Sequence, residues 1–166
     1  MDVIDVAAKD TSKEPWEFAG LLLLVGLGVV ISPFRIIIDF VSTYPPIFTE
    51  GTWDSITSMN SLNYDPYWGT LITVEIIANL VFIFLTFFLL FLFFKKKSIF
   101  PKWYFICALA TVLFALTNSY LVSWIYPSIE LWSEDTIRHM VSGLVSIFVW
   151  TPYLFTSERA KNTFIQ

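Results

Sequence analysis

The chain has 166 residues, of which 56% are hydrophobic and only 14% are charged, so one small soluble core could not bury its apolar surface. Its formal net charge is −4 and its basic residues are scattered or lie at the ends of apolar segments, which argues against a nucleic acid as partner. The single cysteine excludes an internal disulfide, a Cys-x-x-Cys pair and a thiolate metal cage. A lipid bilayer is the partner that this composition predicts.

Four apolar segments follow one another along the chain, at about residues 18–41, 69–94, 100–124 and 137–155. Each is near the ~20 residues that a helix needs to cross the hydrocarbon. Because lipid offers no hydrogen bonds to the backbone, such spans must be helical or form a closed barrel, and the alternation that a barrel needs is missing. The sequence therefore predicts an all-α protein, with residues 1–166 forming one antiparallel bundle of four transmembrane helices.

The first span is preceded by a polar stretch, residues 1–14, that resembles a targeting segment only superficially. This stretch is more acidic than basic, and no small-x-small cleavage site follows the apolar run. We therefore expect an uncleaved first span.

Eight of the ten basic residues fall on one side of the predicted bundle. They are Lys9, Lys13, Lys95, Lys96, Lys97, Lys102, Arg159 and Lys161. The opposite connections, residues 42–68 and 125–136, carry acidic residues and no Lys or Arg. Since positive charge is retained in the cytoplasm, this split predicts that both termini are cytoplasmic and both of these connections face outward.

The longer outer connection, residues 42–68, contains the adjacent prolines Pro45 and Pro46 and also Gly51. These residues favour a turn-rich, structured loop over a flexible linker. Such a loop could cap the bundle or receive a partner.

Each span carries a stripe of polar or small residues at helical spacing. In the first span Gly28, Ser32, Arg35 and Asp39 recur at steps of four, three and four. Polar groups that face lipid are costly, so such stripes predict faces that pack against protein or water. Within the first span, Pro33 predicts a kink.

Seven of these polar residues form a candidate intramembrane cluster in the outer half of the bundle. The cluster contains Arg35, Asp39, Glu75, Asn79, Asn118, Arg138 and His139. Arg35, Glu75 and Asn118 each lie roughly 10 Å from the outer end of their helix, which predicts one shared layer.

Two interpretations of this cluster remain open. The first, which we favour, is a network of salt bridges that fixes helix register, with Arg35 paired to Asp39 or Arg138 paired to Glu75. The second is an externally open cavity in which Glu75 binds and releases protons or a cation. For His139 the sequence holds no second histidine, so no metal site, proton relay or cofactor is predicted.

Catalytic motifs are missing from the sequence, which has no Gly-x-Ser-x-Gly elbow, no His-Glu-x-x-His and no Walker loop. We therefore do not expect an enzyme. A lipid-modifying enzyme or intramembrane hydrolase that uses Asp39 or Glu75 is the weakest alternative.

Three segments of the chain carry a resemblance to a known family. They are Gly20-Leu-Leu-Leu-Leu-Val-Gly-Leu-Gly with Ile31-Ser-Pro-Phe-Arg, Phe100-Pro-Lys-Trp-Tyr, and Val149-Trp-Thr-Pro-Tyr-Leu-Phe-Thr-Ser-Glu-Arg-Ala-Lys-Asn-Thr-Phe. Together they resemble the YdgK-like bacterial inner-membrane proteins, a family catalogued as a domain of unknown function. The resemblance implies a four-helix protein of the bacterial inner membrane, and it brings no activity, cofactor or catalytic residue.

The function that the sequence favours is that of a non-enzymatic accessory or assembly factor for a membrane complex, with a membrane-protein partner or as a homo-oligomer. The alternative is a small proton- or cation-coupled transporter that uses the polar cluster. The tail that follows the fourth span is expected to be either an interfacial helix or a docking peptide. Its residues are Ser157, Glu158, Arg159, Lys161 and Phe164.

Overall fold

The computed structural model describes residues 20–128, 132 and 134–165, and within these ranges every regular element is a helix. In chain order the elements are α1 (Leu21–Thr49), α2 (Thr52–Thr57), α3 (Trp68–Phe94), α4 (Phe100–Ile125), α5 (Glu134–Val145), η1 (Ser146–Trp150), α6 (Thr151–Thr156) and α7 (Glu158–Thr163). The polar stretch before the first span and part of the second outer connection lie outside the described residues.

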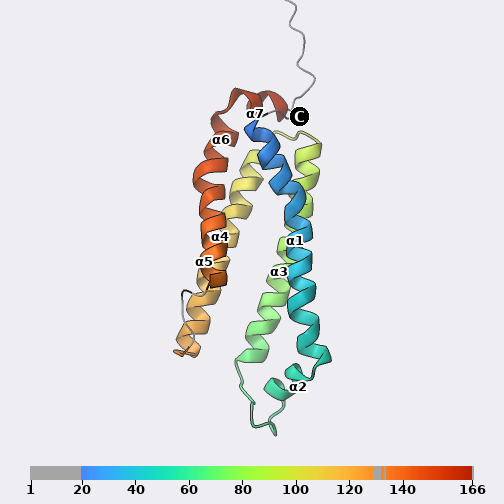
Figure 1. The fold of residues 1–166 in the computed structure, drawn as a ribbon, viewed down its shortest axis with the longest axis vertical. Coiled ribbons are helices and arrows are strands. Elements are labelled where there is room, and N and C mark those ends of the chain that lie inside the picture. The colour runs from blue at the N-terminus through green and yellow to red at the C-terminus, as the bar shows by residue number, and fades with distance from the viewer. Residues whose placement is uncertain (1–19, 129–131, 133, 166) are drawn as a thin grey trace, which may run out of the picture.

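Four helical stretches are long and apolar enough to cross a membrane: α1, α3, α4 and the composite stretch Thr136–Thr156, which joins α5, η1 and α6. They run alternately in opposite directions, with α1 packed on α3 and α4 packed on α5 (Figure 1). The prediction of an all-α membrane protein with four spans is confirmed.

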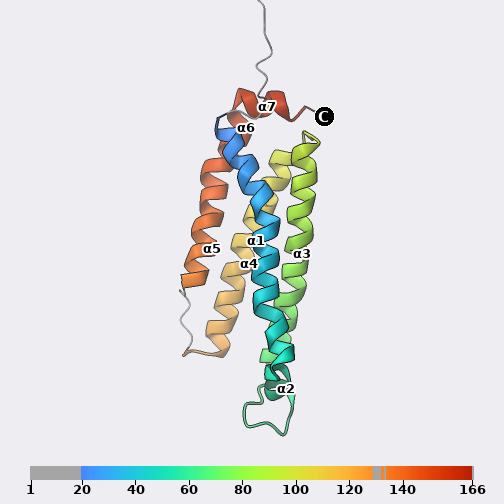
Figure 2. The same ribbon diagram turned by 45° about the vertical axis from the view of Figure 1, so that its right-hand side comes forward.

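The two ends of the bundle differ. The first residues of α1, the α3–α4 connection and α7 lie at one end, and α2 lies at the other (Figure 1). In the turned view, α7 lies across its end of the bundle (Figure 2). We refer to these as the α7 end and the α2 end.

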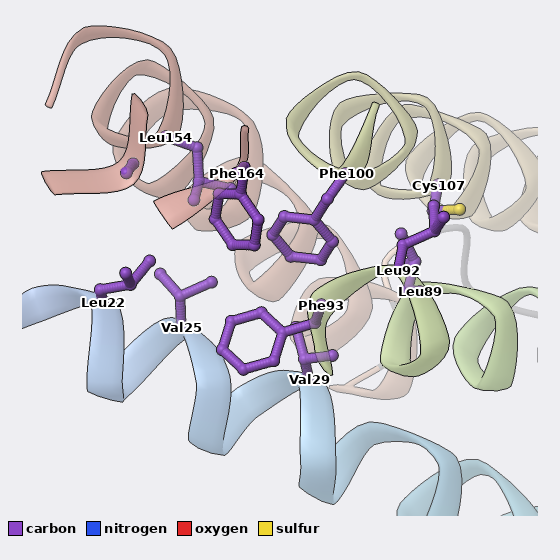
Figure 3. Packing of buried hydrophobic residues seen from close by; sticks show 11 residues of the cluster. Leu22, Val25, Val29, Leu89, Leu92, Phe93, Phe100, Cys107, Leu154 and Phe164 are labelled. Atoms are coloured by element: carbon purple, nitrogen blue, oxygen red, sulfur yellow. The ribbon is translucent and has the colours of Figure 1, made fainter. Parts of the chain in front are cut away.

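The best-packed part of the molecule is at the α7 end. Phe100, Leu22 and Leu154 are completely or almost completely buried there. The ring of Phe164 stacks on Phe100 at a centroid distance of 4.6 Å, and the ring of Phe93 meets Phe100 edge-on at 5.4 Å (Figure 3). The C-terminal segment that follows the fourth span therefore folds back as α7 and contributes Phe164 to this core.

Helix α1 continues through Pro33 without a break in the helix. Proline has no N–H, so Pro33 leaves the carbonyl of Val29 without its usual helical donor. The Ser32 hydroxyl donates a hydrogen bond to that carbonyl oxygen at 3.1 Å. The neighbouring serine thus compensates for the missing donor.

Helix α1 also extends to Thr49, eight residues beyond the predicted end of the first span at residue 41. The two adjacent prolines had predicted a loop here. Tertiary contacts favour the helix instead, because Tyr44 is buried against α3 and the ring of Phe48 lies 5.0 Å from that of Trp53 in α2. The outer connection therefore begins at residue 50 and includes the short helix α2.

The fourth span contains a π-helical segment, η1, immediately before α6. Pro152 in the first turn of α6 cannot donate to the carbonyl one turn earlier, and a wider turn is a common response to such a defect. The Thr151 hydroxyl donates to the carbonyl oxygen of Ser146 at 2.9 Å across this segment.

Candidate functional site

Three of the seven predicted cluster residues come together between α3 and α4. Asn118 in α4 donates a hydrogen bond from Nδ2 to Oε1 of Glu75 in α3 at 2.5 Å. Asn79, one turn further along α3, donates from Nδ2 to the Tyr44 hydroxyl oxygen and to the Glu75 carbonyl oxygen, both at 2.9 Å. We call Tyr44, Glu75, Asn79 and Asn118 the Glu75 site.

Sequence reasoning missed Tyr44 because it placed residue 44 in a loop. The signal was nevertheless present. If the helix is continued through the two prolines, Tyr44 falls on the same face as Leu22, Val29 and Pro33, all of which are buried.

The Glu75 site lies towards the α2 end of the bundle. Glu75 is roughly 28 Å along α3 from Phe94, in a bilayer whose hydrocarbon core is about 30 Å thick. The side chains of Glu75, Asn79 and Asn118 are half-buried. Among the described residues, no cationic group forms an ion pair with Glu75.

The other four predicted residues are not brought to this site. Arg35 and Asp39 form an ion pair along α1, with 3.8 Å between Nε and Oδ2, and their side chains are 51% and 60% exposed. Arg138 and His139 are exposed on α5. The predicted seven-residue cluster is therefore corrected to the three residues Glu75, Asn79 and Asn118. Of the predicted layer of Arg35, Glu75 and Asn118, only Glu75 and Asn118 meet, because Arg35 is exposed on another face of α1.

The reason for this separation is visible on α1. Its buried face is formed by Leu22, Val25, Val29 and Pro33, which pack on the rest of the bundle. At 100° per residue, Arg35 lies roughly 140° around the helix from Leu22. The polar stripe of α1 and its packed face are different faces.

The connection between α2 and α3 forms an open pocket of about 390 Å³ at the α2 end. The residues that line it include the aromatic residues Trp53 and Tyr64, the acidic residue Asp65 and Thr70. A Cβ atom at Gly69 would lie 3.0 Å from Thr57 Cγ2, so glycine there allows α2 to sit close against the start of α3.

Asp65 connects this pocket to the end of α4. Its Oδ1 accepts a hydrogen bond from the backbone N–H of Tyr67 at 2.8 Å, and the ring of Trp68 stacks on that of Tyr126 at 4.7 Å. The polar contact with the Tyr126 hydroxyl, followed by the backbone N–H of Tyr67, holds the pKa of Asp65 below its usual range. Asp65 is therefore ionised at neutral pH.

The hydroxyl oxygen of Tyr126 is buried and forms no hydrogen bond with the residues that the structure describes. Burial, followed by the neighbouring Asp65 carboxylate, raises the pKa of Tyr126. The phenol therefore stays neutral as it faces the carboxylate.

A family model described as "Protein of unknown function (DUF2569)" matches residues 17–165, a range that contains all four spans and α7. No curated protein and no solved structure matches the chain significantly. The chain, a multi-pass helical membrane protein by its four spans, belongs to the DUF2569 family, whose description assigns no activity.

Proposed function

We propose that this chain is a non-enzymatic accessory or assembly protein, of the YdgK-like kind, in the bacterial inner membrane. Both termini face the cytoplasm, as the distribution of Lys and Arg predicts, and the α2 end faces outward. The chain binds an outward-facing segment of another membrane protein at the pocket beside α2.

The observation that carries this proposal is the pocket itself, which is built from a connection that contacts the bundle at several points. The ring of Phe48 contacts that of Trp53, and the missing side chain at Gly69 allows α2 to pack closely on α3. Asp65 lies beside Tyr126 at the end of α4. A platform held in this way binds a partner without a large cost in chain ordering.

The chemistry of the pocket indicates what it binds. Aromatic rings and an ionised carboxylate together favour a segment that presents a Lys or Arg side chain, because the cation can meet Asp65 and lie against Trp53 or Tyr64. The predicted partner is therefore a membrane protein with a basic outward loop.

Filling the pocket should release the partner. Thr70 is exposed and lines the pocket, so Thr70→Trp is expected to reduce recovery of the partner about tenfold, the equivalent of 1.4 kcal/mol of binding free energy. The measurement is the stoichiometry of a copurifying membrane protein after extraction from native membranes in mild detergent.

The matched control is Thr52→Trp, which places the same side chain at an exposed position of α2 outside the pocket lining. Partner recovery should match that of the unsubstituted chain. The proposal fails if the unsubstituted chain repeatedly purifies without a stoichiometric partner, or if both tryptophan variants retain the partner equally.

A second candidate function, proton- or cation-coupled transport, is favoured by the Glu75 site. Glu75 lies in an apolar helix with an amide as its side-chain partner, and no described cation neutralises it. A carboxylate in this position can take up a proton or a cation from the α2 end.

For this candidate, Glu75→Gln is expected to reduce proton or cation flux in reconstituted vesicles by about tenfold or more. Glutamine retains an acceptor oxygen for Asn118, so folding should be preserved while the titratable group is lost. Glu50→Gln, at the exposed end of α1, is the matched control and should leave flux unchanged. Equal flux in the two variants would exclude this role for Glu75.

A further inference from the structure

Helix α1 carries a polar stripe on a face that is turned away from the rest of the bundle, and no described part of the same chain covers this stripe. Gly28, Ser32, Arg35 and Asp39 recur at helical spacing, and the two charged side chains are at least half exposed. A Cβ atom added at Gly28 would meet no atom within 4 Å. By contrast, a Cβ at Gly26 would lie 2.6 Å from the ring of Phe93.

The two glycines therefore have different surroundings. Gly26 permits α1 to pack on α3, whereas the absence of a side chain at Gly28 serves no contact with any residue that the structure describes. The Ser32 hydroxyl already donates to the Val29 carbonyl, so Ser32 presents a small, satisfied side chain on the same face. Small residues at a four-residue spacing allow the backbones of two membrane helices to approach closely.

The depth of the charged pair makes exposure to lipid unfavourable. At the α7 end, a Cβ at Gly20 would lie 3.5 Å from the guanidinium group of Arg159, which marks the headgroup level at the start of α1. Arg35 is roughly 21 Å further along the helix, within a hydrocarbon core of about 30 Å. Charged groups at such depth normally face protein or water.

We propose that a second copy of this chain covers the stripe, with the two α1 helices in contact at Gly28 and Ser32. Copies inserted with the same topology run their α1 helices parallel, around a two-fold axis along the membrane normal. In this arrangement each residue is level with its own counterpart, so the long side chain of Arg35 extends about 6 Å along the helix, one turn, to reach Asp39 of the other copy.

A second copy is the partner that the charges fit best. The stripe carries one cation and one anion one turn apart, so two copies together bring two cations and two anions within reach of one another, with no net charge. The guanidinium group has several donors in a fixed fork, so Arg35 can contact the Asp39 of its own chain and that of the second copy together. The pocket at the α2 end plays no part in this contact, so the inference does not depend on the proposed function.

Cysteine cross-linking in native membranes tests the contact directly. In a Cys107→Ala background, Gly28→Cys is expected to form disulfide-linked dimers on mild oxidation, because the two Gly28 positions face each other closely. Leu27→Cys is the matched control, since Leu27 is 55% exposed and lies next to Gly28 in the chain, at nearly the same depth, but about 100° around α1 on another face. Equal cross-linking at the two positions, or none at Gly28, would overturn the proposal.

Charge reversal separates a contact between copies from the ion pair within one helix. Arg35→Asp makes the stripe doubly negative and Asp39→Arg makes it doubly positive, so each variant alone should lose self-association by about tenfold or more, measured by energy transfer between labelled chains in vesicles. Mixing the two variants should restore association, because opposite stripes then meet.

The mixing result is decisive because the intrahelical pair is lost in both variants and mixing cannot repair it. Restored association with no self-association of either variant supports the dimer. An unsubstituted chain that remains monomeric at all densities in vesicles, or a mixture that associates no better than its components, contradicts it.

Discussion

Phe100→Ala is expected to lower the free energy of unfolding by about 2–3 kcal/mol. Phe100 is completely buried at the α7 end, where it contacts the rings of Phe93 and Phe164. Removing the ring leaves a cavity between three separate segments of the chain, and large-to-small substitutions of this kind in soluble cores cost about 3–5 kcal/mol. The expected value is smaller here because lipid is no worse a solvent for apolar groups than the protein interior, so lost packing dominates.

The measurement for this prediction is reversible unfolding of the purified protein by titration with a denaturing detergent. The control is Phe84→Ala, which removes the same kind of side chain from α3, where it is 71% exposed. This substitution should change the unfolding free energy little. Equal effects of the two substitutions would show that the aromatic cluster does not hold the α7 end together.

The sequence predicts the four spans correctly because a long apolar run in lipid has few structural options. Residues 69–94 and 100–124 agree with α3 and α4 to within one residue at each end. Their ends are fixed by a tryptophan and by a lysine-rich connection, and both are local features that sequence reasoning can use.

The end of α1 and the tail required tertiary information. Pro45 and Pro46 locally disfavour a helix, and only the burial of Tyr44 against Asn79 and the contact of Phe48 with Trp53 explain why α1 continues. Likewise, the residues after the fourth span fit an exposed docking peptide as well as a helix. The packed helix is favoured over an exposed peptide because Phe164 packs on Phe100, which lies more than sixty residues away in the sequence.

The candidate site shows the same limit. The sequence predicts one cluster that contains Glu75, Asn79 and Asn118, with Asn118 level with Glu75, and these three residues do meet. The stripe on α1 was assigned inward because polar groups avoid lipid. Helix α1, however, has an apolar face that packs on the bundle and a separate polar stripe, and periodicity alone cannot say which of the two the same chain covers.

Gly143→Ala is expected to lower the free energy of unfolding by about 1–3 kcal/mol although it adds only a methyl group. A Cβ atom at Gly143 in α5 would fall on Cγ2 of Val112 in α4, and the Ala108 carbonyl oxygen lies 3.9 Å from the same point. Valine is stiff about χ1, so Val112 cannot easily turn away, and α5 must move off α4.

The partner substitution provides the test of this mechanism. Val112→Ala removes the atom that the new methyl group would strike, so the double variant should be more stable than the sum of the two single effects implies, by about 1–2 kcal/mol. Both single variants and the double variant are measured by the same detergent titration. Additive effects would mean that the close approach of α4 and α5 does not limit stability, and the contact between these helices would then have to be maintained elsewhere along their length.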